Sequence, residues 1–416
     1  MMGAAEMSET STLEPGETGS RSNGLALLAL ALGSFAIGTS EFASMGILQL
    51  FAEALRIDVP VATNAITAYA LGVVVGAPVI TLAAARLNRR ALLLGLMALF
   101  VAGNLLSSMA AGIASLAAAR FVSGLAQGSY FGAGAVVATH IVGAARAGKA
   151  FSLVVSGLTV AMIVGSPLAT FLRQHLGWRN TYLAVAGLGA LALAALWAWT
   201  PRSEALRGSP VRQELAALAQ PRVWTMMAVA ALAVSSIFAV YTFIGPFVTD
   251  AALLPPAQVP VALALFGIGM STGNIVGGRL ADRYRHRGLV VGFGLALAVL
   301  AVLGLGGSDR WILMPSLFGV GLTTMTAIPT IQVRLTKLAP SAPTLMGAMN
   351  MAALNVANAI GAWAGGAAIG SGLGLLSTVW AGFALTVAGL AVFWFSVHRA
   401  PPPAESEAAG ILSGAQ

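Results

Sequence analysis

The chain has 416 residues, of which 58% are hydrophobic and only 9% are charged, and its formal net charge is +8. A soluble domain carries about 25% charged residues, so this composition excludes an ordinary water-soluble protein and indicates one embedded in a membrane. The absence of cysteine excludes disulfides and thiolate metal sites.

The first 23 residues are polar and acidic, and we expect a disordered tail without a cleavable signal peptide. Twelve apolar stretches follow, each long enough to cross a ~30 Å hydrocarbon core as a helix. Polar residues are confined to the loops, which favours helices over barrel strands. The predicted fold class is therefore an all-α membrane protein with twelve transmembrane helices. They lie near residues 25–48, 62–83, 91–110, 112–139, 149–171, 180–200, 223–247, 258–279, 288–306, 310–332, 343–368 and 372–396.

The longest polar interval inside the chain, residues 201–222, follows the sixth stretch. We interpret it as a cytoplasmic linker between two six-helix bundles, residues 24–200 and 223–397, with a second disordered tail at 398–416. Seventeen Lys and Arg residues lie in the tails and even-numbered loops, against four in the odd-numbered loops. The positive-inside rule therefore predicts that both termini face the cytoplasm. This placement of basic residues at helix ends indicates topology and not nucleic-acid binding.

The first apolar stretch contains one carboxylate, Glu41, within AIGTSEFASMG. At a rise of ~1.5 Å per residue, Glu41 lies roughly 24 Å from the start of its helix, in the outer third of the bilayer. A carboxylate that faced lipid there would cost several kcal/mol, so Glu41 must face protein or water. It is the only carboxylate deep within any stretch, and we predict that it takes up and releases protons.

The fourth stretch carries Arg120 at a depth similar to that of Glu41, and the two are predicted to pair. Arg120 either modulates the proton affinity of Glu41 or forms a permanent ion pair that only joins helices. Gln127 lies two turns further on the same face, followed by Phe131, and both either line a substrate pocket or pack between helices. Tyr69 on the second stretch is a further pocket candidate or an interfacial aromatic.

The C-terminal half offers its own pocket candidates. Phe238 and Tyr241 on the seventh stretch either contact a substrate or lie near the outer headgroups. Asn355 and Asn358 on the eleventh stretch share one helical face. Because an amide is costly in lipid, both asparagines are expected to point inward, as hydrogen-bond partners between helices in preference to substrate contacts.

Two loops are similar to each other. TLAAARLNRRALL follows the second stretch and GRLADRYRHRGLV follows the eighth, which aligns Arg86 with Arg283 and Arg90 with Arg287. Each loop follows the second helix of its half, so the two halves are predicted to share one architecture.

The second of these loops resembles the G-x-L-a-D-R-x-x-x-R motif of the major facilitator superfamily, whereas in the first loop Ala85 stands in place of Asp282. The fourth stretch resembles the family's R-x-x-x-G-x-x-x-G motif, which begins here at Arg120. GLTVAMIVGSPLAT on the fifth stretch resembles the antiporter motif, around Gly165 and Pro167. GTSEF on the first is similar to the signature of the drug:proton antiporter branch, which holds arabinose, sugar, nucleoside and chloramphenicol exporters.

The resemblance implies two pseudo-symmetric six-helix bundles around a central cavity. It also implies a helix bend at Gly165 and Pro167 and a cytoplasmic gate, closed by ion pairs between the bundles. The expected gate residues are Gly278, Asp282, Arg283, Arg287, Arg86 and Arg90.

Together, Glu41 and the resemblance predict a proton-coupled exporter of a small drug, sugar or nucleoside-like solute that works by alternating access in a bacterial inner membrane. An uptake symporter of the same fold and a non-transporting receptor are the alternatives. The sequence has no Walker A loop and no nucleophile–base arrangement, so no enzymatic activity is expected. The expected partners are lipid, protons and a small-molecule substrate; no cofactor, metal or nucleic acid is predicted, and the protein is expected to be a monomer.

Overall fold

The computed structural model describes residues 15–175, 177–208, 210–284 and 287–398, and every regular element within them is a helix. The N-terminal half begins with a long helix that starts at Pro15, ahead of the apolar stretch itself. Its elements are α1 (Pro15–Gly46), α2 (Leu48–Leu55), α3 (Val59–Ala62), α4 (Asn64–Ala83), α5 (Arg89–Ser108), α6 (Ile113–Val142), η1 (Ala144–Arg146), α7 (Ala147–His175) and α8 (Gly177–Trp199).

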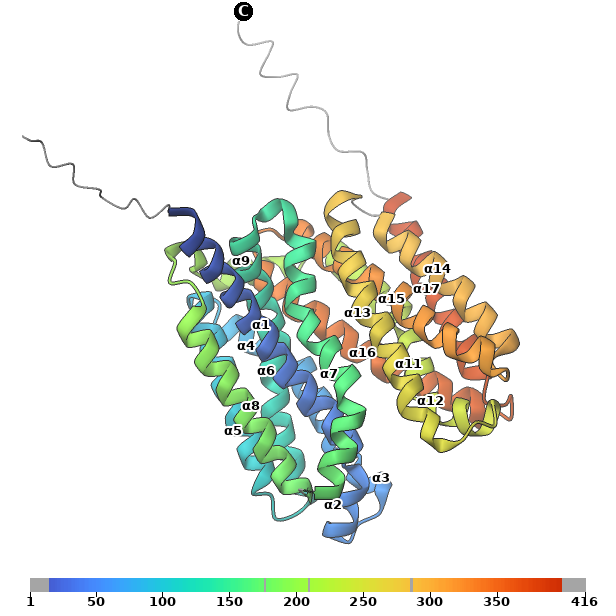
Figure 1. The fold of residues 1–416 in the computed structure, drawn as a ribbon. Coiled ribbons are helices and arrows are strands. Elements are labelled where there is room, and N and C mark those ends of the chain that lie inside the picture. Colours follow the sequence, from blue (N-terminus) through green and yellow to red (C-terminus); the bar gives the residue numbers. More distant parts are fainter. Residues whose placement is uncertain (1–14, 176, 209, 285–286, 399–416) are drawn as a thin grey trace, which may run out of the picture.

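The C-terminal half follows a linker that contains η2 (Glu204–Leu206) and α9 (Val211–Leu218). Figure 1 shows the two halves as adjacent groups of steep helices. The remaining elements are α10 (Pro221–Ala233), α11 (Ser235–Tyr241), α12 (Ile244–Pro246), η3 (Phe247–Ala251), η4 (Pro256–Gln258), α13 (Val259–Arg283), α14 (Arg287–Gly306), α15 (Arg310–Leu338), α16 (Pro343–Gly370) and α17 (Ser377–His398).

The chain is a multi-pass membrane protein with the predicted all-helical fold. Eleven candidate membrane spans, judged by length and hydropathy, occur in the described part of the chain. The twelfth long helix, α6, is less apolar because Arg120, Ser123, Gln127 and Ser129 lie along it, and all four are buried within the protein. Helix α6 is therefore a central helix whose polar groups are shielded from lipid by its neighbours.

The stretch expected to form one helix over 223–247 is divided. Helix α10 ends at Ala233, α11 ends at Tyr241, and a single turn of π-helix begins at Phe247. Pro246 lacks the N–H that would continue the helical ladder, which accounts for the second interruption. The break lies directly after Tyr241, one of the predicted pocket residues.

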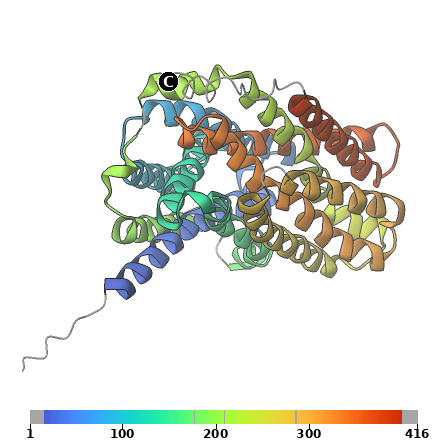
Figure 2. The same cartoon turned by 90° about the horizontal axis from the view of Figure 1, so that it is seen from above.

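Both the first and the last long helix have their terminal ends on one side of the molecule, at the top of Figure 1. We name this side the terminal face. Helix α7 packs against α13, and α16 packs against α4 and α6. Towards the terminal face these contacts include Asp282 with Gly148 and Gly347 with Gly132. We name these contacts the seam, and Figure 2 shows it from above, with α16 lying between the two groups of helices.

Small residues bring the helices of the seam close together. A Cβ placed on Gly347 of α16 would lie 2.5 Å from the Cα of Gly132 on α6. On the other side of the seam, Ser152 Oγ donates to the carbonyl of Asn274 (2.7 Å), and Asn274 Nδ2 donates back to the carbonyl of Ser152 (2.8 Å). These contacts join the two bundles directly, so they must separate if that side opens.

Candidate functional site

Glu41 lies near the end of α1 and is half-buried. Gln127 of α6 donates from Nε2 to Glu41 Oε2 across 3.3 Å. The charge of Glu41 also acts on Tyr69 of α4 and Tyr241 of α11. Its surroundings therefore come from both bundles, and the carboxylate faces the interior of the protein as the sequence predicts.

Arg120 lies beside Glu41 and is fully buried. Its Nη1 donates to Ser40 Oγ (2.7 Å) and its Nη2 to the Ser40 carbonyl (3.4 Å). The guanidinium carbon lies 4.2 Å from the ring centroid of Tyr69 and 5.4 Å from that of Tyr182. A guanidinium stacked between two aromatic rings is held in place by cation–π attraction as well as by hydrogen bonds.

The predicted Glu41–Arg120 ion pair is not formed in this conformation. Among the residues that the structure describes, Arg120 bonds Ser40, and Glu41 accepts from Gln127. Ser40 and Glu41 are consecutive on α1, so their side chains point about 100° apart, and the arginine meets the serine. The charge of Arg120 still acts on Glu41 through space.

Three buried polar atoms around Glu41 have no hydrogen-bond partner within the described residues. They are the Tyr69 hydroxyl, Gln127 Oε1 and Arg120 Nε. Buried polar groups are normally paired because an unpaired one costs about 1–3 kcal/mol. This cluster therefore has hydrogen-bonding capacity that the protein does not itself use.

The aromatic pocket candidates divide into two groups. Tyr241 lies between the rings of Phe42 (6.4 Å between centroids) and Phe266 (5.6 Å), so it bridges α1 and α13 close to Glu41. Phe238 is half-buried on the same short helix. Phe131 instead is completely buried and packs edge-on against Tyr130 within α6.

The two asparagines of α16 do not join the Glu41 cluster. Asn355 is buried, and its Nδ2 donates to the carbonyl of Met351 on its own helix. Asn358 is half-buried one turn further along. A third asparagine, Asn350, does bond another helix, donating to Gln332 Oε1 of α15 across 2.9 Å.

At the terminal face, Asp282 reaches from the end of α13 to the first turn of α7. Its Oδ1 accepts from the backbone N–H of Gly148 (2.7 Å) and its Oδ2 from that of Lys149 (3.0 Å). Gly278, one turn earlier, faces Ser152, and a Cβ there would collide with the serine hydroxyl. The contact across the seam is thus a carboxylate on a helix N-terminus, where the helix dipole favours negative charge.

The expected ion pairs between the bundles are absent among the described residues. Arg283 and Arg287 are exposed. Arg86 lines an open surface pocket beside the linker, and Arg90 donates to the carbonyl of Trp197 within its own bundle. Arg86, Arg283 and Arg287 remain at the surface because solvent satisfies their charge at a lower cost in free energy than a buried partner would.

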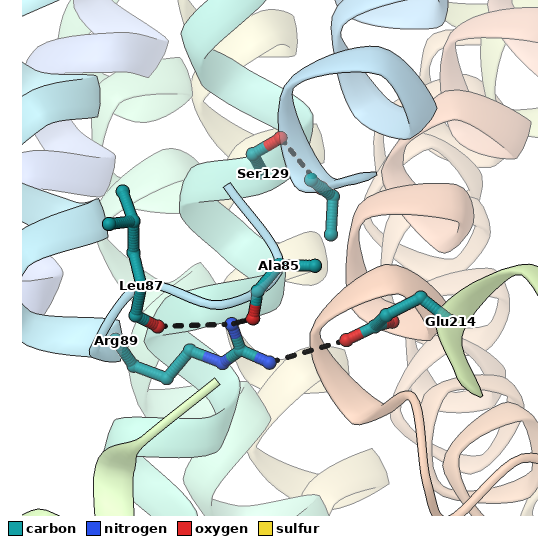
Figure 3. A network of polar contacts seen from close by, with 6 residues as sticks. Ala85, Leu87, Arg89, Ser129 and Glu214 are labelled. Carbon is teal, nitrogen blue, oxygen red and sulfur yellow. Dashed lines mark hydrogen bonds and ion pairs between the residues drawn. The ribbon is translucent and has the colours of Figure 1, made fainter. Parts of the chain in front are cut away.

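One ion pair that sequence reasoning missed is fully buried. Arg89 at the start of α5 pairs with Glu214 of the linker helix α9 (Nη2–Oε1 3.3 Å), as Figure 3 shows. The available signal was that Glu214 is the one acidic residue in the segment VRQELAAL. Gly165 and Pro167 fall within the bounds of α7, but their side-chain surroundings lie outside the described residues.

Comparisons with a family model and with known proteins all indicate one family of membrane proteins. The family model described as Major Facilitator Superfamily matches residues 30–353 and 246–415. Inner membrane transport protein YdhP of Escherichia coli (strain K12) is 39% identical over 366 residues, covering 86% of this chain and 94% of that protein. The chloramphenicol resistance protein of Streptomyces lividans is 35% identical over 388 residues, covering 92% and 99%.

A solved structure of the proton:xylose symporter XylE, bound to 6-bromo-6-deoxy-D-glucose, is similar in fold. Its TM-score is 0.71 at 13% sequence identity, and the match covers 90% of this chain and 96% of that one.

Proposed function

This chain belongs to the major facilitator superfamily, and we propose that it exports a small organic solute across a bacterial inner membrane in exchange for protons. It is a membrane transporter by family and not an enzyme. Export, proton coupling and the class of cargo are the parts of this statement that we infer, and each has its own support.

The observation that carries the proposal is the environment of Glu41. A half-buried carboxylate near the outer end of α1 is hydrogen-bonded by the neutral amide of Gln127 and has groups of both bundles around it. An ionisable residue at such a depth marks an ion or proton pathway by default. In our account, Glu41 loads a proton when the bundles expose it on one side and releases the proton when they expose it on the other.

Arg120 acts as the modulator of Glu41. In this conformation it is bonded to Ser40, which neighbours Glu41 on α1. An arginine that moves closer favours the ionised carboxylate and one that stays away favours the protonated one. Because Ser40 and Glu41 lie on one helix, a rotation of α1 changes the relation of both residues to Arg120.

The cargo is inferred from the groups that surround Glu41. Within the described residues, the Tyr69 hydroxyl and Gln127 Oε1 are unpaired. The ring of Tyr241 lies close by, with Phe238 on the same helix. A few polar contacts among aromatic walls fit a neutral or weakly polar molecule. The relatives are consistent with this class, since one is a chloramphenicol resistance protein and another is a probable sugar efflux transporter.

We take the terminal face as the cytoplasmic one, since it carries most of the Lys and Arg residues. The seam then closes the cytoplasmic half of the transporter in this conformation. Asp282 is our candidate for a gate residue because it joins α13 to the first turn of α7. The basic residues near it are assigned to topology.

The direction of transport is tested in proteoliposomes with labelled chloramphenicol as the probe. A drug:proton antiporter accumulates the probe when the lumen is more acidic than the medium, since protons then leave as the probe enters. Accumulation only when the medium is the more acidic side would favour uptake symport over export. Glu41→Gln removes the gradient dependence in either case, whereas Glu53→Gln, on the exposed side of α2, leaves it intact.

A further inference from the structure

The linker between the bundles contains a short amphipathic helix, α9, that lies on the terminal face. Its Glu214 and Ala217 are buried, and it packs against α4 and α10. The segment before α9 is also attached to the N-terminal bundle: Asn88 Nδ2 donates to the carbonyl of Ser203 across 2.9 Å. The linker is therefore a packed part of this face and not a free tether.

The buried side of α9 presents a carboxylate to the loop after α4. Glu214 Oε1 lies 3.3 Å from Arg89 Nη2, with side-chain exposures of 0% and 2%. Arg89 Nη1 also donates to the carbonyl of Ala85 (3.1 Å), as Figure 3 shows. Burying two charges is costly unless they are paired, and removing one partner leaves the other buried without compensation.

The same carboxylate faces the other bundle. It lies beside the first turn of α16 (Figure 3), near the backbone N–H of Leu345, and its Oε2 has no hydrogen-bond partner within the described residues. Thr344, Leu345 and Met346 of that turn are buried, the N-cap residue Ala342 makes no side-chain hydrogen bond, and Pro343 has no N–H. The first N–H groups of a helix have no partner within the helix, so a carboxylate there stabilises the end of α16.

The opposite side of the seam also has a carboxylate at a helix N-terminus, and there the hydrogen bonds are formed. There, Asp282 at the end of α13 caps the first turn of α7 in the other bundle. The residue that aligns with Asp282 in the first loop is Ala85, which carries no carboxylate. The helix pair that corresponds to α13 and α7 is α4 and α16, which are also in contact, and Glu214 lies where they meet.

We propose that Glu214 supplies from the linker the carboxylate that the first loop lacks, and that it holds α16 against the N-terminal bundle while the terminal face is closed. The linker is thereby a part of the gate: α16 leaves Glu214 when this side opens. The inference requires that the two bundles separate at this face. It does not depend on proton coupling, on the direction of transport or on the cargo.

The test measures access to the seam directly. The chain has no cysteine, so a single Thr139→Cys substitution provides a unique thiol. Thr139 lines a cavity of about 160 Å³ at the seam, together with residues of α7, α15 and α16. The rate of labelling by a fluorescent maleimide is measured on the detergent-purified full chain, without substrate or pH gradient, so failure of the proposed export would leave this measurement unaffected.

Glu214→Gln is expected to raise the labelling rate about tenfold, which corresponds to ~1.4 kcal/mol in the closed–open equilibrium. The matched control is Glu204→Gln in the same linker. Glu204 is 82% exposed and, among the described residues, pairs only with the exposed Arg207, so the labelling rate of Glu204→Gln should equal that of the parent. Equal rates for Glu214→Gln and the parent would overturn the proposal.

A rescue separates the gate from simple anchoring of the linker. Adding Ala85→Asp to Glu214→Gln restores a carboxylate at the aligned position, and the labelling rate should return towards that of the parent. If this rescue fails, Glu214 only anchors the linker, and its proposed role as the substitute for the missing aspartate is overturned. If Glu214→Gln does not fold, Glu214→Asp replaces it in the test. This variant keeps the charge but has a shorter side chain, so it should label faster than the parent. An unchanged rate would contradict the proposal.

Discussion

A single methyl group in the seam should open the terminal face. Gly347 of α16 faces Gly132 of α6, and a Cβ added at Gly347 would lie 2.5 Å from the Cα of Gly132. Ordinary contacts of a Cβ begin at 3.4 Å, so Gly347→Ala requires the two helices to move apart by about 0.9 Å. Neither atom belongs to a flexible side chain, so the movement must be made by the helices.

The size of the effect follows from the cost of overpacking. Extra methyl groups in a close-packed interior cost about 1–3 kcal/mol. Because α6 and α16 belong to different bundles, this cost applies to the closed state and disappears when the seam opens. We therefore expect Gly347→Ala to shift the closed–open equilibrium by about 5- to 150-fold towards the open state.

The assay is the maleimide labelling rate of Thr139→Cys, with two glycine controls. Gly321→Ala also places a Cβ 2.5 Å from a backbone atom, the Phe266 carbonyl oxygen, but within the C-terminal bundle. It should lower the melting temperature without faster labelling. Among the described residues beyond the adjacent backbone of its own helix, no atom lies within 4 Å of a Cβ added at Gly95. Gly95→Ala should therefore change neither the melting temperature nor the labelling rate. If Gly347→Ala labels no faster than Gly321→Ala, the seam is not what keeps this side closed.

Three further substitutions test single contacts. Asn274→Ala removes the reciprocal hydrogen bonds with Ser152, so seam labelling should accelerate about fivefold; an unchanged rate would show that the pair does not hold the seam. Arg120→Lys keeps the charge but loses the stacking on Tyr69, and we expect a loss of about 1–2 kcal/mol in denaturant unfolding; stability equal to the parent would refute that. Tyr69→Phe deletes a buried hydroxyl that has no partner among the described residues, so the melting temperature should stay level or rise while the KM for chloramphenicol increases. An unchanged KM would remove Tyr69 from the cargo site.

Much of the fold follows from hydropathy. Long apolar stretches predict membrane helices because backbone polar groups in lipid must be satisfied within the helix. The division of the seventh helix was not predicted, although Pro246 indicates where an interruption is favoured. The pairing of helices across the seam depends on side-chain contacts such as Gly132 against Gly347, which hydropathy does not encode.

The sequence indicated which residues lie around Glu41 better than it indicated which hydrogen bonds they form. Depth along the helix identified Glu41 and Arg120, and helical spacing added Gln127. The rotation of α1 decides that Arg120 meets Ser40 instead of Glu41, and a sequence does not give that rotation. The Arg89–Glu214 pair joins positions 125 residues apart, so no local pattern could connect them.

The central claim concerns the proton that Glu41 carries. The most direct measurement records proton movement into or out of proteoliposomes with a trapped pH-sensitive dye while an imposed chloramphenicol gradient runs down. We predict that the parent and Glu53→Gln move protons against the direction of the probe, and that Glu41→Gln still exchanges labelled for unlabelled chloramphenicol but moves no protons. A Glu41→Gln variant with the proton flux of the parent would contradict the account.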